Sequence, residues 1–338
     1  MNKRWNYRPK GSTWGDWGED DQLGRLNLLT PARRIEAVKE VIEGVTFCLS
    51  LPLNLPGGNA VNPKRHEPKF GPVFQSGDHY YNFDWGEHTH GLMDITSDES
   101  ITLYSQYSTQ WDSLAHVGCK FDIYGDGSLI PVYYNGFKAG LDIGGPDGIK
   151  DIGAKALGIE RMAYTGVQGR GVLISLYKHF GIDRVSVNYQ MLMDILREDN
   201  IIIEKGDMVL FHTGWDDMIL SMGGDPDADR LHSSCAVLDG FDQKLLNWIS
   251  NAEISVIATD NMAVEDPFIS GETEGGCSRL PLHRHCLFRL GVHLGELWFL
   301  SELGKALLDR NRSRFLLTAP PLRMPGAVGS PVNPIATI

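Results

Sequence analysis

The sequence predicts one domain in which strands and helices alternate, an α/β or α+β architecture. Two apolar stretches, RGVLISL and GDMVLFHTGW, are typical of buried strands that end in polar residues. Between them, NYQMLMDILRED carries its apolar residues at helical spacing. Because no internal repeat, low-complexity tract or linker divides the chain, residues 1–338 are expected to form a single domain.

The first elements have clear local signals. Residues 1–25 are polar and rich in Trp and Gly, so we expect an arm that lies over the body or over a partner subunit. A helix is predicted next, with Thr30 as its N-cap, Pro31 at its first position and Gly44 as its stop. The stretch VTFCLSLPL then predicts a strand.

The middle and end of the chain predict further elements. Residues 54–98 are rich in Pro, Gly, His and aromatic residues without a sustained period, which is typical of a functional loop. SITLYSQYSTQWD predicts a strand, FDQKLLNWISNA a helix and ISVIATD another strand. LPLHRHCLFRLGVHLGELWFLSEL predicts a helix that runs into a strand.

Composition excludes several functional classes. The formal charge of −12 argues against nucleic acid or an anionic membrane as a partner. No window approaches 18 consecutive apolar residues, and the N-terminus lacks the apolar core of a secretory signal. The five cysteines are odd in number and form no C-x-x-C pair, which indicates reduced thiols in a cytoplasmic protein.

The strand that ends near residue 112 raises the main functional question. Successive side chains of a strand point to opposite faces, so Gln106, Ser108, Gln110 and Asp112 are expected to share one face. His116 follows just beyond them. This polar face predicts an active site, a metal site or a solvated sheet surface, whereas Tyr107 and Trp111 belong on the opposite face.

Two other places combine a strand end with ionisable residues. The first is His212 in LFHTGW, together with Asp260, Asn261 and Glu265 in ATDNMAVED. The second is the group of His283, His285 and Glu296 in PLHRHCLFRLGVHLGEL.

The segment QYSTQWDSLAH resembles the signature of the putative cyclase family of metal-dependent hydrolases, which includes bacterial kynurenine formamidase and isatin hydrolase. That signature is H-x-G-T-H-x-D-x-P-x-H. Thr109, Asp112 and His116 match it at the same spacing, while the departures are Gln106, Ser108, Gln110 and Leu114. DDQLGRLNLLTP, GRGVLISL, GDMVLFHTGW, ATDNMAVEDP and GSPVNPIA are similar to the other blocks of a longer, STQWDSLAH-bearing branch, in order.

The resemblance implies a single α/β domain of the swivelling β/β/α type, with a mixed sheet flanked by helices, and a homodimer or homotetramer. It implies Asp112 as a metal ligand and His116 as the general acid/base. His283 and Glu296 would be a later pair of ligands, with His285 as the alternative to His283.

The two glutamines change the expected metal. A carboxamide offers a weakly basic, hard oxygen, so Mn²⁺ or Mg²⁺ is expected in preference to Zn²⁺, with Gln110 assisting as a ligand. The alternative is a site without metal, in which Gln106 and Gln110 bind the substrate instead. Ser108, Trp111 and His212 are expected to contact the substrate as well.

The resulting hypothesis is a hydrolase that opens an amide (C–N) or lactone bond of a small, cyclic or aromatic compound with metal-activated water. Two alternatives stay open. One is a metal-free lyase, dehydratase or cyclisation catalyst that uses His116 and Asp112, and the other is a non-catalytic binding protein. A small molecule is the expected partner in each case.

Overall fold

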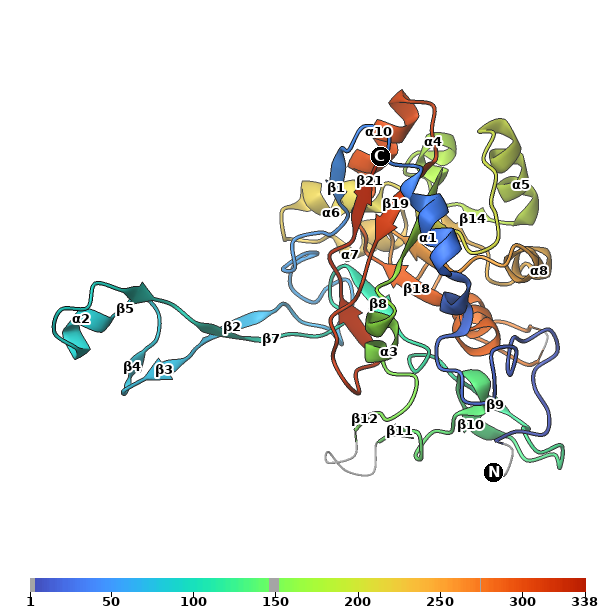
Figure 1. The fold of residues 1–338 in the computed structure, drawn as a ribbon. Helices are drawn as coiled ribbons and strands as arrows, with labels where there is room; N and C mark the ends of the chain where they lie inside the picture. The colour runs from blue at the N-terminus through green and yellow to red at the C-terminus, as the bar shows by residue number, and fades with distance from the viewer. Residues whose placement is uncertain (1–3, 146–151, 274) are drawn as a thin grey trace.

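A nine-stranded mixed sheet forms the centre of the protein (Figure 1). The computed structural model describes residues 4–145, 152–273 and 275–338. In spatial order the strands are β1 (Thr46–Cys48), β21 (Ile335–Thr337), β19 (Arg314–Thr318), β13 (Gln168–Ser175), β15 (Met208–His212), β17 (Val256–Thr259), β18 (His293–Glu296), β8 (Gln110–Asp112) and β20 (Gly329–Pro331). The sheet curls and is flanked by helices, so the predicted α/β fold of the swivelling β/β/α type is confirmed.

The centre of the sheet is parallel and its margins are antiparallel. Strands β13, β15, β17 and β18 run parallel to one another, while β19 pairs antiparallel with β13 and β8 pairs antiparallel with β18. The central strands are short apolar runs because helices cover both of their faces.

Helices pack on the two faces of the sheet. α5 (Tyr189–Glu198) and α8 (Gln243–Asn251) share a core with Val209 and Ile257. α3 (Ile159–Tyr164) and α10 (Ser301–Asp309) share a second core with Leu210 on the opposite face. Outside the arm, the other helices that the structure describes are η1 (Gly24–Leu28), α1 (Pro31–Val38), η2 (Tyr134–Gly136), α4 (Leu176–Phe180), α6 (Trp215–Met222), α7 (Ala228–His232), α9 (Pro281–His283) and the π-helix η4 (Arg284–Leu290).

Helix α1 begins where its capping signal predicts. The Thr30 hydroxyl accepts a hydrogen bond from the Arg33 N–H at 3.3 Å, and Pro31 occupies the first turn. The helix ends at Val38, well before Gly44, and its two largest apolar side chains do not face the core, although Ala37 is buried. Ile35 is 64% exposed and Val38 is 55% exposed.

The N-terminal segment lies on the body. Trp5 and Trp14 are buried, and the Trp14 indole N–H donates to the Phe288 carbonyl at 2.7 Å. This contact holds residues 4–25 against η4. Residues 1–3 of the predicted arm lie outside the described part of the chain.

The irregular segment after β1 contains a projecting arm, residues 69–102, which extends away from the body (Figure 1). β2 (Lys69–Pro72) pairs with β7 (Glu99–Thr102) along the stem. Further out lie β3 (Phe74–Gln75), β4 (Asp78–His79), β5 (Phe83–Asp84), α2 (Trp85–His88) and β6 (Ile95–Thr96). These elements are only two to four residues long, so no period could be recognised in the sequence.

Three small two-stranded sheets complete the fold. They pair β9 (Cys119–Phe121) with β10 (Ile130–Val132), β11 (Ile143–Gly144) with β12 (Gly153–Ala154), and β14 (Ser186–Val187) with β16 (Val237–Leu238). Within the three described ranges, no helix is both long enough and apolar enough to cross a membrane.

His293 on β18 predicts a specific loss of stability in acid. Burial lowers the pKa of His293 to about 3, whereas the unfolded chain titrates near 6.5. The unfolded state therefore binds the proton first, so stability contributed by the neutral ring is complete above pH 6.5 and falls as the pH drops toward 3. At pH 5 the loss amounts to about 2 kcal/mol. Denaturant unfolding is expected to show that His293→Leu loses less stability between pH 7.5 and pH 5.0 than the wild type does. His90→Leu, at an exposed position, is the control, and equal losses in all three proteins would contradict the assignment.

Candidate active site

Two neighbouring antiparallel strands bring the central residues together. Glu296 on β18 lies opposite Gln110 on β8, and Leu294 lies opposite Asp112. Side chains two residues apart share a face of a strand, so Gln110, Asp112 and Glu296 all point to the face on which Leu294 packs. The Gln110 amide N–H donates to Glu296 Oε2 at 2.9 Å.

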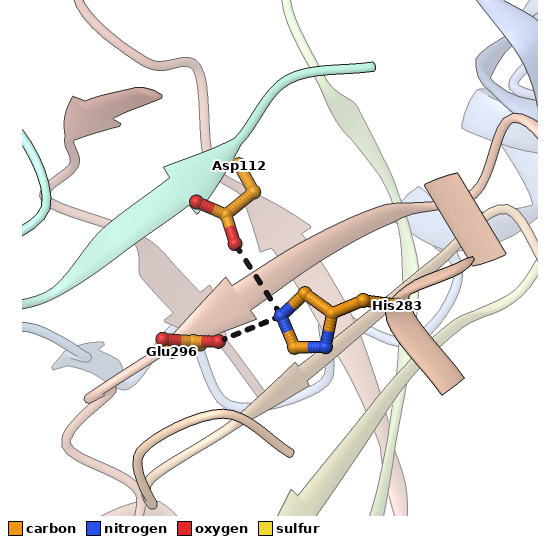
Figure 2. A group of neighbouring side chains, drawn as sticks. All are labelled: Asp112, His283 and Glu296. Carbon is orange, nitrogen blue, oxygen red and sulfur yellow. Dashed lines mark hydrogen bonds and ion pairs between the residues drawn. The ribbon is translucent and has the colours of Figure 1, made fainter. Parts of the chain in front are cut away.

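His283, at the end of the short helix α9, completes the group from the side. Its Nε2 lies 3.2 Å from Glu296 Oε1 and 3.8 Å from Asp112 Oδ2 (Figure 2). All three side chains are buried. Figure 2 shows the imidazole directed between the two carboxylates, each carried by a separate strand.

Glu265 holds His283 in this orientation. One Glu265 oxygen lies 2.9 Å from His283 Nδ1 and also accepts the backbone N–H of His283 at 2.8 Å. The other oxygen accepts the backbone N–H of Leu282 at 2.8 Å. The carboxylate therefore fixes both the start of α9 and the proton on Nδ1, which leaves Nε2 facing Asp112 and Glu296.

Gln106 links Asp112 to His116. Its side-chain amide donates to Asp112 Oδ1 and lies 3.1 Å from His116 Nδ1. His116 Nε2 is 3.8 Å from Asp112 Oδ2, and the His116 side chain is 23% exposed. His116 is thus the member of the group that solvent or a ligand can reach.

Burial and neighbouring charges shift the pKa values of these groups in opposite directions. Burial raises the pKa of Asp112, and the charge of Glu296 raises it further, although His116 and His283 oppose the change. Burial would also raise the pKa of Glu296, but the hydrogen bond and charge of His283 hold it below its ordinary value. Burial would lower the pKa of His283, and its contacts with Glu265 and Glu296 outweigh that effect and raise the pKa to about 10.

The donor set fits a divalent cation. Asp112, His283 and Glu296 each offer one ligand atom, and these atoms lie within 4.8 Å of one another. Asp112 Oδ2 and Gln110 Oε1 are buried, and neither has a hydrogen-bond partner among the residues that the structure describes. Buried oxygens are normally paired, so these two are suited to contact a cation.

Ser108 and Trp111 do not join this group. The strand covers only residues 110–112, so the alternation that predicted a shared face does not extend back to Ser108. The Ser108 hydroxyl instead donates to the Pro52 carbonyl at 3.3 Å. Trp111 points to the opposite face, where its ring centroid is 5.0 Å from that of Trp298 and its N–H donates to the Ala319 carbonyl. The predicted substrate contacts of these residues are not supported by their positions.

His212 lies on the opposite face of the sheet as well. It follows Leu210 by two residues and packs against α10, where a Cβ on Gly304 would lie 2.9 Å from His212 Nδ1. Its two ring nitrogens are each 3.1 Å from a serine hydroxyl, that of Ser175 and that of Ser301. The expected contact of His212 with a substrate at Asp112 does not fit this position.

His285 cannot replace His283. It lies in η4, where its Nε2 is 2.9 Å from the Ser250 hydroxyl on α8. Burial and the charge of Arg289 lower the pKa of His285 to about 3. Of the two histidines predicted as alternatives, the structure places His283 beside Asp112 and Glu296 and places His285 beside Ser250.

A second buried group, His212, Asp216 and Asp260, also brings three possible ligand atoms together. Here the carboxylates already have partners. Asp260 accepts hydrogen bonds from the backbone N–H groups of residues 213–215 at the start of α6. Asp216 accepts from two backbone N–H groups and the Ser301 hydroxyl at the start of α10. These bonds give the pair a structural role as helix caps.

Sequence reasoning missed the roles of Glu265 and Arg65. The sequence pattern grouped Glu265 with His212. Only the tertiary structure shows that the loop of Glu265 passes beside α9. The Arg65 guanidinium donates to the Gln106 carbonyl at 2.6 Å, and its charge helps to hold the pKa of Glu296 down. Arg65 lies in the irregular segment after β1, where the sequence offered no signal.

Comparisons with known proteins agree with this architecture. Residues 47–266 match the family model described as putative cyclase. A crystal structure of a novel cyclase is 31% identical, with a TM-score of 0.76 over 99% of this chain and 100% of that one. Isatin hydrolase A from Labrenzia aggregata, bound to benzyl benzoate, is 14% identical with a TM-score of 0.53 over 92% of this chain and 98% of its own. Isatin hydrolase A from Ralstonia solanacearum is 13% identical with a TM-score of 0.52 over 86% and 91%.

A comparison with curated protein sequences gave no significant match. The family match covers well over half of the chain and includes the strand that carries Asp112. The chain therefore belongs to the putative cyclase family.

Proposed function

We propose that this protein is a hydrolase that opens an amide (C–N) or lactone bond of a small, cyclic or aromatic compound with metal-activated water. The observation that supports it best is the buried group of Asp112, Glu296 and His283, in which one carboxylate oxygen has no hydrogen-bond partner among the described residues. A partly exposed histidine, His116, lies directly beside this group.

The ligands of the ion would be Asp112, Glu296 and His283, and the side-chain oxygen of Gln110 would be a further ligand. Two carboxylates and an amide oxygen are hard ligands, so the set favours Mn²⁺ or Mg²⁺ over Zn²⁺. A divalent ion there would supply an activated water nucleophile and polarise the scissile carbonyl.

His116 would move the protons. It can take a proton from the attacking water and return it to the leaving nitrogen or oxygen. Gln106 Nε2 lies 3.1 Å from His116 Nδ1 and also donates to Asp112 Oδ1, so the Gln106 side chain would hold the His116 ring beside the carboxylate. Gln106 would therefore act on the reaction through the orientation of His116.

Two further observations support the proposal. Two structures with this fold are isatin hydrolases, so the fold hosts hydrolytic chemistry in other proteins. All five cysteines are free thiols, which supports a cytoplasmic location.

Metal analysis of protein purified without chelators tests the proposal directly. The wild type is expected to hold a divalent ion, and Asp112→Asn is expected to bind that ion at least about 10-fold more weakly because it loses a charged ligand. Incubation with small cyclic amides and lactones should give products heavier by one water, with loss of activity after chelation and in His116→Ala.

Asp217→Asn makes the same chemical change on the exposed side of α6 and serves as the control. Turnover that chelators do not affect would contradict the metal-dependent mechanism. A product lighter by one water would instead indicate a dehydratase.

Restoring the imidazole at residue 110 is expected to shift the preferred metal. Gln110→His would place a nitrogen ligand beside Asp112 and Glu296, and imidazole binds Zn²⁺ better than a carboxamide does. We expect the zinc affinity to rise at least about 10-fold while the manganese affinity changes less. Competitive titration with a chromophoric chelator measures both, and Gln168→His on β13 is the control at a distant, half-buried site. An unchanged zinc affinity in Gln110→His would argue against Gln110 as a neighbour of the ion.

Removing the charge of Glu265 is expected to weaken metal binding without removing a ligand. Glu265→Gln keeps the shape of the side chain but weakens the bond that fixes the proton on His283 Nδ1. A loss of about 10–100-fold in metal affinity is expected, as for other partners of ligating histidines. Calorimetric titration with Mn²⁺ gives the affinity, and Glu302→Gln, at an exposed position on α10, is the control. Equal affinities in the two variants would show that Glu265 only stabilises the fold.

A further inference from the structure

A cavity of about 430 Å³ lies on the face of the sheet opposite to the candidate active site, where α4 and α10 border it. Tyr177 and Leu308 contribute apolar walls to this cavity. Its polar lining includes Ser175, His212 and Ser301. Cavities that bind small molecules typically measure about 300–1,000 Å³ and combine apolar walls with a few convergent polar groups. The cavity therefore has the size and the lining of a small-molecule site.

Two of the polar residues end neighbouring parallel strands. Ser175 is the last residue of β13, His212 is the last residue of β15, and the two are paired across the strands. Ligands of α/β proteins commonly bind outside the carboxyl ends of parallel strands. Ser175 also begins α4, where its hydroxyl oxygen accepts the backbone N–H of Lys178 at 3.2 Å. Both side chains are therefore held by regular secondary structure, which fixes their positions more closely than a loop does.

The His212 ring is poised to accept a proton. Its side chain is buried, and burial lowers the pKa of His212, although the charges of Asp216 and Asp217 oppose the change. A neutral imidazole has one nitrogen that carries a proton and one that accepts a hydrogen bond. The neighbours of the ring decide which nitrogen is which.

The hydrogen bonds around His212 run in one direction. The Ser301 hydroxyl donates its single hydrogen to Asp216 Oδ1 at 2.7 Å, so it can only accept from the ring. His212 Nε2, 3.1 Å from the Ser301 oxygen, therefore carries the proton. This leaves the lone pair of His212 Nδ1 for the Ser175 hydroxyl, whose oxygen is also 3.1 Å away.

Another serine–histidine pair in the chain shows that this direction is not general. His285 Nε2 is 2.9 Å from the Ser250 hydroxyl, but that hydroxyl donates its hydrogen to the Leu246 carbonyl at 3.1 Å. Ser250 therefore accepts from His285, and the ring cannot take the proton of this serine. The two pairs differ in the direction of the hydrogen bond, and Ser250 does not line the cavity beside α4 and α10.

We propose that Ser175 is a nucleophile activated by His212, and that this second site takes up the acyl group of small, uncharged esters. Such catalysis requires a nucleophile, a base within hydrogen-bond reach and a third group that orients the base. Ser175 and His212 supply the first two, and Ser301 with Asp216 supplies the third. The activity is separate from the proposed metal-dependent hydrolysis, because it uses other residues on the opposite face of the sheet.

The lining of the cavity indicates the class of substrate. The Tyr177 ring lies 5.4 Å from the ring of His212, and Leu308 adds an aliphatic wall, so an apolar acyl group fits beside the serine. The rim reaches solvent, since the Lys305 side chain is 76% exposed. The charged residues of the lining are of both signs and do not select a charged substrate. They are Lys178, Asp217, Glu302 and Lys305.

The reaction transfers one acyl group and one proton at each step. Ser175 Oγ attacks the carbonyl carbon of the ester while its proton passes to His212 Nδ1. The bond from that carbon to the alcohol oxygen then breaks, and His212 returns the proton to the departing alcohol. Water releases the acyl group from Ser175 as the free acid by the same two transfers. The ionised Asp216 would stabilise the imidazolium through Ser301 while the proton is on the ring.

The test is covalent labelling of the full-length protein with diisopropyl fluorophosphate, from which a serine oxygen displaces fluoride. Mass spectrometry of peptides is expected to find the diisopropylphosphoryl group on Ser175. Ser175→Asn keeps a side-chain oxygen that can cap α4 but has no hydroxyl, so it is expected to lose this label while remaining folded. His212→Gln is expected to label at least about 100-fold more slowly, because it removes the base.

The role of Ser301 is tested by a pair of variants. Ser301→Ala is expected to slow the labelling of Ser175 at least about 10-fold, because the ring can then carry its proton on Nδ1. Ser301→Thr keeps the hydroxyl and is expected to restore most of the rate. A purely structural role of Ser301 would lower the thermal stability without this difference in labelling.

Ser250→Ala is the control, because it removes a serine next to a histidine outside the cavity. It is expected to label like the wild type. Labelling and the release of 4-nitrophenolate from 4-nitrophenyl acetate are also measured after chelation. Both are expected to persist there, whereas metal-dependent opening of cyclic amides is lost, so a failure of either proposal is seen independently. Circular dichroism of each variant shows whether it is folded.

Three results would overturn the proposal. The first is a folded wild type in which Ser175 carries no label. The second is labelling of Ser175 at the same rate in the wild type and in His212→Gln. The third is equal labelling of Ser175 and Ser250, because that would show that the direction of the hydrogen bond does not activate the serine.

Discussion

Two buried carboxylates held within reach of one imidazole are the constraint around which this protein is arranged. Asp112 and Glu296 are placed by the pairing of β8 with β18, and like charges in a buried site repel each other strongly. Hydrogen-bond donors surround the two carboxylates and offset their repulsion. Gln106 donates to Asp112, Gln110 donates to Glu296, and His283 lies between the two carboxylates. The loop that carries Glu265 and the short helix α9 are held in place by the bonds that orient His283.

Gln106 also connects the site to the arm. Gln106 lies four residues after β7, the return strand of the arm, and its carbonyl accepts a hydrogen bond from Arg65, which lies four residues before β2. The ring of His66 is 5.2 Å from that of Tyr104, so the two roots of the arm are in contact. The hydrogen bond from Arg65 therefore ties the backbone of Gln106 to the segment that precedes the arm, while the Gln106 side chain reaches both Asp112 and His116.

Much of the scaffold could be predicted from the sequence, because local signals determine it. Thr30 caps α1 as its sequence predicts, and the apolar runs ending at Ser175 and His212 are buried strands. Asp112 and Gln110 share a face because both lie in strand β8. Glu296 joins them because β18 pairs with β8 in a register that could not be predicted from the sequence.

Three side chains, those of His212, Ser108 and His285, lie away from the group at Asp112 for reasons that the sequence pattern did not reveal. His212 ends a strand as predicted, but its face of the sheet depends on the alternation within β15, and that alternation places it with Leu210. Ser108 was assigned to a strand that begins only at Gln110, and His285 lies in a π-helix that turns it toward α8. Contacts with Pro52 and Ser250, which are distant in the sequence, accompany the positions of Ser108 and His285, whereas the alternation within β15 decides the face of His212.

Gln106 and Gln110, which stand where the signature of the cyclase family has histidines, orient the two carboxylates of the site. Gln106 and Gln110 each hold one oxygen of a carboxylate, so Asp112 Oδ2 and Glu296 Oε1 remain directed at His283 Nε2. Without an ion, the contacts of His283 with Glu265 and Glu296 favour its protonated form, which supplies positive charge beside the carboxylates. The proposed divalent ion would supply that positive charge instead. Because an uncompensated charge is costly in a buried site, such an ion would stabilise the ionised form of both carboxylates. The glutamines are neutral in both states, so they orient the carboxylates without competing for the positive charge.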